Sequence, residues 1–277
     1  MRDNESGYGS PSSKGGMKVQ DNNMALEQAL RAAAHSSGSA AKLPQHVPTV
    51  EEAYAVQRNI YNSSNLPVTV WKLGLTGAEV RKAFGTEEPT VGRLAASGIF
   101  NNRSEIQFLG PKMFAEAELI FEMGEDLPMQ AEPYTRSDLC AALKGIYAGI
   151  EIVRSRFETT KLSLPLLIAD NSMGHGLVLG RKLAVQWDDR FADIPVSLTR
   201  NDEAPTAGST ARVMGNPLDA AVWLANWLRD NENDTLKREQ LIASGTCTGA
   251  TEMFAGDTIS IDVDGEQAAL VRLCEEI

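Results

Sequence analysis

Apolar residues at helical spacing dominate the beginning of the chain. Residues 22–36 carry them along one face, which predicts a helix there. The periodic positions are Met24, Leu26, Leu30 and Ala33. A second helix is predicted from Thr49 to about residue 63, because Thr49 is followed three residues later by Glu52, the spacing of a capping box. Helices are therefore expected to be concentrated in the N-terminal part.

After Pro67 the pattern changes to the alternation of apolar and polar residues that is typical of strands. Residues 68–75 predict a strand, and the segment after them predicts a short helix that ends at Gly85. Further strands are predicted at 104–109, 114–123, 145–153, 176–180, 182–187, 194–199 and 208–214.

The last part of the chain predicts one long helix and one hairpin. The segment "NPLDAAVWLANWLRD" has helical spacing, with Pro217 in its first turn. The segment "GDTISIDVDGEQAALVRL" alternates in two runs joined by Asp264 and Gly265, the residue pair of a tight hairpin turn. Many strands without a regular strand–helix alternation favour an α+β fold with a mixed or antiparallel sheet.

The 277 residues, of which 43% are hydrophobic, suffice for a large core. One domain is predicted over residues 17–277, with a helical part at about 22–66 and a β-rich core at about 67–277. Residues 1–16 are mostly Gly, Ser and polar residues, which predicts a disordered tail or an expression remnant.

The charge of the chain excludes some partners. A net charge of −11 without a dense Lys/Arg block argues against nucleic acid, and no apolar run is long enough to span a membrane. Cys140, Cys247 and Cys274 are far apart and form no zinc or CxxC motif. We therefore expect a cytoplasmic protein with reduced thiols.

Carboxylates are concentrated on one face of the strand predicted at 114–123, "FAEAELIFEM". Glu116 and Glu118 leave the same face about 7 Å apart, a spacing that suits two ligands of a hard cation such as Mg²⁺ or Mn²⁺. Glu151 lies in an apolar run and is a candidate third ligand, because Glu is rarely buried unless it is paired or coordinated. From the pattern alone, a solvated strand face is the commoner explanation. Glu122, one repeat further along, is expected to be exposed.

Other familiar catalytic motifs are absent from the sequence: there is no GxSxG, Walker, HExxH or GxGxxG motif. Lys72, between Trp71 and Leu73, is either a surface lysine with a buried stem or a catalytic residue.

Several segments, in this order, resemble the fumarylacetoacetate hydrolase superfamily. The most similar group is that of the 2-keto-4-pentenoate (2-hydroxypentadienoate) hydratases and 4-oxalocrotonate decarboxylase. The segments, which together cover about residue 22 to the end, are "WKLGLTG", "EPTVGRL", "FAEAELIFEM" followed by "DLP", "IEIVRSRFE", "IADNSMGHGLVLG", "GNPLDAAVWLANWL" and "SGTCTGATEMFAGDTISIDVDG". The resemblance implies a mixed β-sandwich roll with an N-terminal helical part. It also implies 2-keto acid substrates that chelate Mg²⁺ or Mn²⁺, and a homo-oligomer.

The resemblance also implies roles for particular residues. The metal ligands fall on Glu116, Glu118 and Glu151, and the active-site lysine falls on Lys72. Lys72 would stabilise an oxyanion or move a proton if desolvation lowers its pKa. The residues implied near the substrate are Leu73, Thr248 and Gly249, with Asp170 and Asn171 in a turn at the mouth of the pocket.

The chain departs from the hydratase pattern at three places. Arg154 stands where "EIVDSR" has Asp, and Thr90 stands where "DQPDFG" has its second Asp. Met173 and Gly174 replace two serines of "ADNASS", and His175 follows them. Arg154 or His175 is therefore a candidate for binding a second substrate carboxylate or for a new acid–base role.

Three functions remain open at this point. The first is a metal-dependent hydratase of a 2-hydroxy-2,4-dienoate in the catabolism of aromatic compounds. The second is a decarboxylase, C–C hydrolase or tautomerase of another 2-keto acid with the same site. The third is a catalytically silent relative that binds a keto acid or supports a partner enzyme of the pathway.

Overall fold

The computed structural model describes residues 13–34, 40–110 and 112–275, and of residues 13–19 only the backbone. Two N-terminal helices are present as predicted, α1 (Ser13–Ala34) and α2 (Val50–Asn62). The first begins earlier than expected and includes residues 13–16, which were assigned to the tail; residues 1–12 lie outside the described residues. The capping box is confirmed, because the Glu52 amide donates to Thr49 Oγ1 at 3.2 Å and the Thr49 amide donates to Glu52 Oε2 at 2.8 Å.

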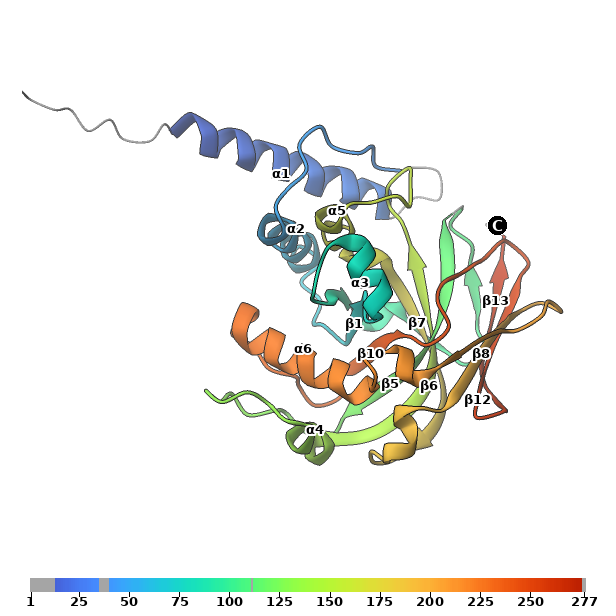
Figure 1. The fold of residues 1–277 in the computed structure, drawn as a ribbon. Coiled ribbons are helices and arrows are strands. Elements are labelled where there is room, and N and C mark those ends of the chain that lie inside the picture. The colour runs from blue at the N-terminus through green and yellow to red at the C-terminus, as the bar shows by residue number, and fades with distance from the viewer. Residues whose placement is uncertain (1–12, 35–39, 111, 276–277) are drawn as a thin grey trace, which may run out of the picture.

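Two mixed sheets form the body of the molecule (Figure 1). In the described residues, the larger sheet has eight strands in the order β2-β1-β10-β5-β6-β7-β3, with β11 paired to β5. Its strands are β1 (Val70–Gly74), β2 (Thr90–Leu94), β3 (Ile99–Asn101), β5 (Met113–Met123), β6 (Leu143–Arg154), β7 (Gly174–Ala184), β10 (Leu241–Thr246) and β11 (Thr251–Glu252). Most pairs are antiparallel, but β1 with β10 and β3 with β7 are parallel. The prediction of an α+β fold with curled mixed sheets is confirmed.

The smaller sheet has the order β4-β13-β12-β8-β9. Its strands are β4 (Glu105–Gln107), β8 (Pro195–Arg200), β9 (Thr206–Ser209), β12 (Thr258–Val263) and β13 (Glu266–Cys274). The predicted C-terminal hairpin is β12–β13, with Asp264 and Gly265 at positive φ in its turn. This sheet lies against one face of the larger sheet, where the main hydrophobic core sits.

Further helices pack beside the two sheets (Figure 1). They are α3 (Ala78–Phe84), α4 (Arg136–Ala142), α5 (Leu164–Ala169) and α6 (Pro217–Glu232), with four short 3₁₀ turns η1 (Ala96–Gly98), η2 (Asn171–Met173), η3 (Asp189–Ala192) and η4 (Thr210–Arg212). The predicted helix α6 packs on β10, and Trp227 of α6 contacts Tyr54 of α2 with ring centroids 5.0 Å apart. No helix in the described ranges is long and apolar enough to cross a membrane.

Two strand predictions need correction. The strands predicted at 176–180 and 182–187 are one continuous strand, β7. The strand predicted at 208–214 ends at Ser209, because the Ser209 hydroxyl accepts a hydrogen bond from the Ala211 amide at 3.1 Å and starts the turn η4. Strands β2, β3, β10 and β11 were not predicted, since their apolar runs are short or absent and β2 and β10 contain glycine.

The two faces of β5 lie in different surroundings, and this difference positions the site. Ala117, Leu119 and Phe121 face the main core between the sheets. The opposite face carries Glu118 and Ile120, and Ile120 belongs to a separate small hydrophobic cluster. Ile120 covers Gly149, the partner of Glu118, so closely that a Cβ at Gly149 would lie 2.5 Å from Ile120 Cγ1.

Candidate metal centre and substrate cavity

Three glutamates from neighbouring strands converge on one face of the larger sheet. Glu116 on β5 and Glu151 on β6 are direct antiparallel partners, and Glu118 follows two residues along β5. One oxygen from each carboxylate lies within 4.8 Å of the others. Glu118 and Glu151 are 1% and 0% exposed, whereas Glu116 is half-buried. A solvated strand face therefore does not explain these carboxylates.

The crowding of the carboxylates disfavours their charged forms. Burial, then the charge of Glu151, raises the pKa of Glu116 to about 7. Burial and the charges of Glu151 and Glu116 raise the pKa of Glu118 well above its usual value. Three ionised carboxylates beside one ammonium carry a net charge of −2, which a bound dication neutralises.

The oxygen atoms fit a hard cation. Glu118 Oε1 and both carboxylate oxygens of Glu151 are buried and, among the described residues, accept no hydrogen bond. Glu118 Oε2 accepts from the Gly245 amide at 2.9 Å, which orients the carboxylate. Lys72 Nζ approaches Glu151 Oε1 as an ion pair, so Glu118 Oε1 and Glu151 Oε2 are the buried acceptors that still need a partner. An all-oxygen ligand set suits Mg²⁺ or Mn²⁺.

Lys72 is buried beside this cluster. It is 2% exposed, so the alternative of a surface lysine is wrong. Its Nζ lies 3.2 Å from Glu151 Oε1 as an ion pair and donates a hydrogen bond to the Ser172 carbonyl at 2.8 Å. Burial alone would lower the Lys72 pKa, but the three glutamates, Glu151 first, raise it above its usual value. The lowering of the Lys72 pKa that burial was expected to cause is thus outweighed by the three carboxylates.

A glycine opposite Lys72 makes room for the lysine side chain. Gly92 on β2 is its cross-strand partner, and a Cβ at Gly92 would lie 2.7 Å from Lys72 Cδ. Gly74 and Thr90 are the next pair on the same face, two residues further along, so they flank the end of the lysine.

The turn η2 borders the cluster with three consecutive residues in the left-handed region. Asn171, Ser172 and Met173 have φ values of 56°, 50° and 60°. The Asn171 side chain holds the turn, because its Oδ1 accepts from the Arg93 amide and its Nδ2 donates to the Arg93 carbonyl, both at 2.8 Å. The unfavourable conformation is thereby tolerated, and it aims the Ser172 carbonyl at Lys72.

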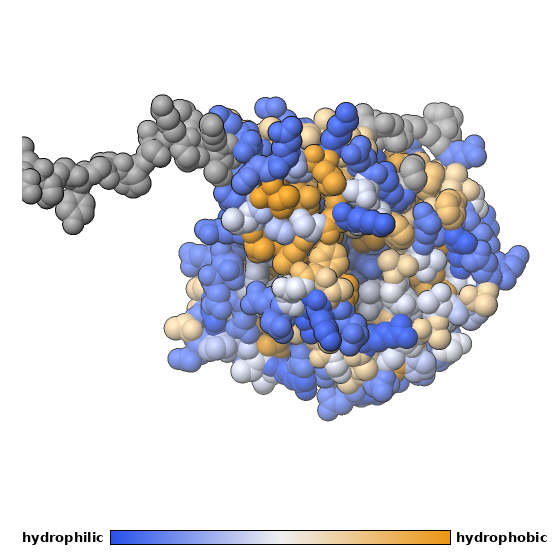
Figure 2. Space-filling model, turned by 45° about the horizontal axis from the view of Figure 1, so that its top comes forward, coloured by the Kyte–Doolittle hydropathy of each residue, from blue (hydrophilic) through white to orange (hydrophobic). Residues whose placement is uncertain are grey.

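Glu116 lines a cavity that consists of two adjoining spaces. Both spaces are lined by Glu116, Gly74, Leu75 and Ala250. The larger, of about 970 Å³, also contains Leu73, Gly249 and two cations, Arg81 and Arg212. The smaller, of about 230 Å³, also contains Lys72, Thr90, Ser172 and Met173, with the apolar side chains of Phe84, Phe114, Val153 and Leu167. Figure 2 shows hydrophobic residues gathered on the helix-bearing side of the molecule, bordered by hydrophilic ones.

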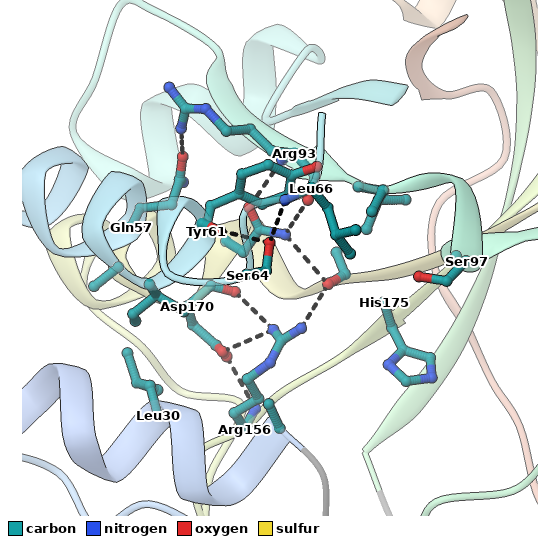
Figure 3. Close-up of a pocket in the computed structure, with 18 residues that line it drawn as sticks. Leu30, Gln57, Tyr61, Ser64, Leu66, Arg93, Ser97, Arg156, Asp170 and His175 are labelled. Carbon is teal, nitrogen blue, oxygen red and sulfur yellow. Dashed lines mark hydrogen bonds and ion pairs between the residues drawn. The ribbon is translucent and has the colours of Figure 1, made fainter. Parts of the chain in front are cut away.

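The sequence-predicted substrate residues fall into two groups. Leu73 and Gly249 line the cavity, and Thr248 is buried next to it, where its hydroxyl donates to the Gly249 carbonyl at 3.1 Å. Asp170, Asn171 and His175 instead line a separate pocket of about 270 Å³ (Figure 3). The turn η2 separates the two, since Ser172 and Met173 face the cavity with Lys72.

The residues of the separate pocket have structural partners (Figure 3). Asp170 accepts from the Arg156 amide at 3.0 Å and from Arg156 Nη1 at 3.1 Å, and Arg156 Nη2 donates to the Gly174 carbonyl at 2.8 Å. Burial, followed by the charges of Arg156 and Arg154, lowers the pKa of His175 to about 4, so this imidazole is neutral. A role of Asp170 in substrate binding stays a prediction, and its contacts support a role in holding the turn.

Arg154 and Glu122 also differ from expectation in their placement. Arg154 is buried, lines neither space of the cavity, and donates to the Ala33 carbonyl at 3.4 Å. The prediction that Glu122 is exposed is wrong, because only 14% of its side chain is exposed. Its carboxylate accepts hydrogen bonds from Lys144 at 2.6 Å and from Tyr147 at 2.8 Å. Burial would raise the Glu122 pKa, but these two hydrogen bonds lower it.

Comparison with known proteins gives the family. No protein-family model matches the chain. The chain is 30% identical to the TodF product hydratase of Pseudomonas putida over 78% of this chain and 81% of that protein. It is 28% identical to the 2-keto-4-pentenoate hydratase of Burkholderia vietnamiensis over 88% of this chain and 95% of that protein.

Among solved structures, the chain resembles the 4-oxalocrotonate decarboxylase from Pseudomonas putida G7 complexed with magnesium and adipate. The TM-score is 0.79 and the identity 22%, over 92% of this chain and 98% of that chain. The chain belongs to the fumarylacetoacetate hydrolase superfamily. Within it, the chain is related to the 2-keto-4-pentenoate hydratases and 4-oxalocrotonate decarboxylase.

Proposed function

We propose that the protein is a metal-dependent hydratase that adds water to a 2-hydroxy-2,4-dienoate and forms a 4-hydroxy-2-keto acid. The observation that carries the proposal is the cluster of Glu116, Glu118 and Glu151 with buried Lys72, in which Glu116 and Lys72 line the cavity. The curated relatives named as hydratases support this reaction over others of the family, and with it a place in the catabolism of aromatic compounds.

The three glutamates would hold Mg²⁺ or Mn²⁺. When bound, the dication supplies a Lewis acid for the carboxylate and 2-keto oxygen of the substrate, and it stabilises negative charge on that oxygen. Glu118 is held in place by the Gly245 amide, and Glu151 by its pairing with Lys72, so the ligands are positioned before the substrate arrives.

Lys72 acts on the substrate directly, separately from the metal. Its ammonium donates a hydrogen bond to the oxygen that becomes negative, or moves a proton to the carbon chain. The Ser172 carbonyl and Glu151 fix its position. The loop at Gly249, with the buried Thr248, lies where the carboxylate end of the substrate would enter the larger space.

A second candidate is a decarboxylase, and a specific observation favours it. The larger space carries Arg81 and Arg212, which suit a substrate with a second carboxylate, such as 4-oxalocrotonate. The sequence pointed to Arg154 or His175 for this role, but neither lines the cavity that contains Glu116. The structurally similar decarboxylase was solved with a dicarboxylate, adipate.

One assay decides between these functions. Purified protein is incubated with Mg²⁺ or Mn²⁺ and 2-hydroxypenta-2,4-dienoate, and both loss of the dienol absorbance and formation of the 4-hydroxy-2-keto acid are followed. The proposal expects hydration that depends on the metal. Release of CO₂ from 4-oxalocrotonate without hydration would favour the decarboxylase. A rise in melting temperature with a keto-acid analogue, but no turnover of either compound, would favour a catalytically silent keto-acid-binding protein.

A further inference from the structure

Three polar residues, Lys72, Thr90 and Ser172, meet at Gly74 on the wall of the smaller space of the cavity. A Cβ placed on Gly74 would lie 2.5 Å from Thr90 Oγ1, 3.6 Å from Ser172 Cβ and 3.9 Å from Lys72 Nζ. These contacts place three polar residues from three separate segments next to Gly74. All four residues line the smaller space of the cavity.

The hydroxyls at this space have no partner among the described residues. Thr90 Oγ1 and Ser172 Oγ are buried and make no hydrogen bond, although the two residues are only 1% and 4% exposed. A buried hydroxyl without a partner costs stability, and such groups usually bond to an ordered water. Two hydroxyls and an ammonium provide the two to four polar partners that a buried water needs.

We propose that this space holds the water molecule that is added to the substrate, and that Thr90 and Ser172 bind it; the proposal rests on the hydratase function. Lys72 can only donate, whereas the two hydroxyls can donate and accept, so together they leave a lone pair of the water oxygen free to react. Because the same Lys72 Nζ lies 3.2 Å from Glu151, the water adjoins the metal cluster.

The chemistry of the addition balances without a further reactant. The 2-hydroxy-2,4-dienoate first tautomerises to a 2-keto-3-enoate, as the enol O–H gives up its proton and C5 takes up one. One O–H bond of the water then breaks, its oxygen forms a bond to C4, and C3 takes up one proton as the C3–C4 double bond is lost. The apolar side chains of Phe84, Phe114 and Met173 line the same space and suit the hydrocarbon part of the substrate. They also keep bulk water away, so that a single bound water is the one that reacts.

The test separates hydration from the preceding tautomerisation. Thr90→Val and Ser172→Ala each remove one hydroxyl with little change of shape. Each is expected to lower the kcat of hydration about tenfold or more, while KM and the rate of deuterium uptake from D₂O into the carbon chain change less than about threefold. The matched control is Ser244→Ala, which removes another buried, unpartnered hydroxyl that lines neither space.

Gly74→Ala would place a Cβ 2.5 Å from Thr90 Oγ1 and so displace this hydroxyl, and it is expected to reduce hydration in the same selective way. Mg²⁺ affinity, measured by calorimetry, is expected to remain within about threefold of wild type in all these variants. A crystal structure is expected to show water within hydrogen-bond distance of Thr90 Oγ1, about 3 Å, in the wild type and none in Gly74→Ala.

The outcomes are distinguishable from failure of the proposed function. If the wild-type protein does not hydrate the dienoate, both proposals are overturned. If it does, but Thr90→Val and Ser172→Ala hydrate as fast as Ser244→Ala, only the water site is overturned. Equal loss of hydration and deuterium uptake would also overturn it, because the hydroxyls would then serve the whole site rather than the water.

Discussion

Lys72 and Glu151 form an ion pair in which neither residue is more than 2% exposed, with Nζ 3.2 Å from Oε1. Such a pair is costly to desolvate and is weak evidence for stability by itself. Here the pair connects the metal cluster with the substrate cavity. Glu151 belongs to the carboxylate cluster, and Lys72 Nζ lies near Gly74 in the smaller space.

Removing the ammonium is expected to destabilise the metal-free protein. Lys72→Met leaves three buried carboxylates without a cation, and breaking a buried pair typically costs roughly 3–5 kcal/mol. Saturating Mg²⁺ should recover part of this loss, because the dication neutralises the same carboxylates. The free energy of unfolding is measured by urea denaturation with EDTA and with Mg²⁺. The control Lys144→Met breaks the more exposed pair with Glu122 and should cost less than about 1 kcal/mol. Equal losses in both variants would contradict the account.

Removing one ligand is expected to remove metal binding. In Glu118→Ala, Mn²⁺ should no longer raise the melting temperature, whereas for the wild type at about 100 times Kd the metal stabilises by about 2.7 kcal/mol. Glu122→Gln is the matched control, since Glu122 lies on the same face of β5 but outside the cluster. Calorimetry that gives an unchanged Mn²⁺ affinity for Glu118→Ala would show that the ligand assignment is wrong.

Because His175 is neutral in the folded protein, it is predicted to cause part of the loss of stability at low pH. Its pKa is about 4 in the folded protein against about 6.5 unfolded, so unfolding between these values takes up a proton. The contribution of His175 is present above pH 6.5 and is lost as the pH falls toward 4. His175→Gln should therefore show a smaller loss of stability from pH 6.5 to 4.5 than the wild type. A histidine resonance of the wild type that titrates near pH 6.5 at this position would contradict the prediction.

The arginines of the larger space predict a preference for dicarboxylates. Arg212→Met should weaken the binding of adipate to the Mg²⁺-loaded protein about tenfold, and leave the binding of a monocarboxylic 2-keto acid such as pyruvate nearly unchanged. Arg154→Met, outside the cavity, is the comparison. If Arg154→Met weakened adipate binding more than Arg212→Met did, the second carboxylate would bind at Arg154, as the sequence first suggested.

Part of the metal cluster could be predicted from short-range rules, and the choice of metal over solvent came from the resemblance to the family. Glu116 and Glu118 share a face through the period of a strand, and Glu151 is conspicuous as a carboxylate in an apolar run. The capping box at Thr49 and the hairpin turn at Asp264 are local in the same way.

The other parts of the site depend on long-range register, which the sequence does not reveal. The space next to Lys72 exists because Gly92 and Thr90 pair with Lys72 and Gly74 across β1 and β2. The assignment of Asp170 and His175 to the substrate followed their position in the "ADNSMGH" segment. The left-handed turn η2 instead directs neighbouring residues to opposite sides, and no local pattern of three non-glycine residues predicts that conformation.

The most direct measurement is a crystal structure of the protein soaked with Mn²⁺ and recorded at a wavelength where manganese scatters anomalously. The account predicts one Mn²⁺ peak bound by oxygens of Glu116, Glu118 and Glu151 at about 2.2 Å, with open positions toward the cavity. Absence of a peak at millimolar Mn²⁺, or a peak that leaves Glu118 and Glu151 uncoordinated, would contradict the central claim.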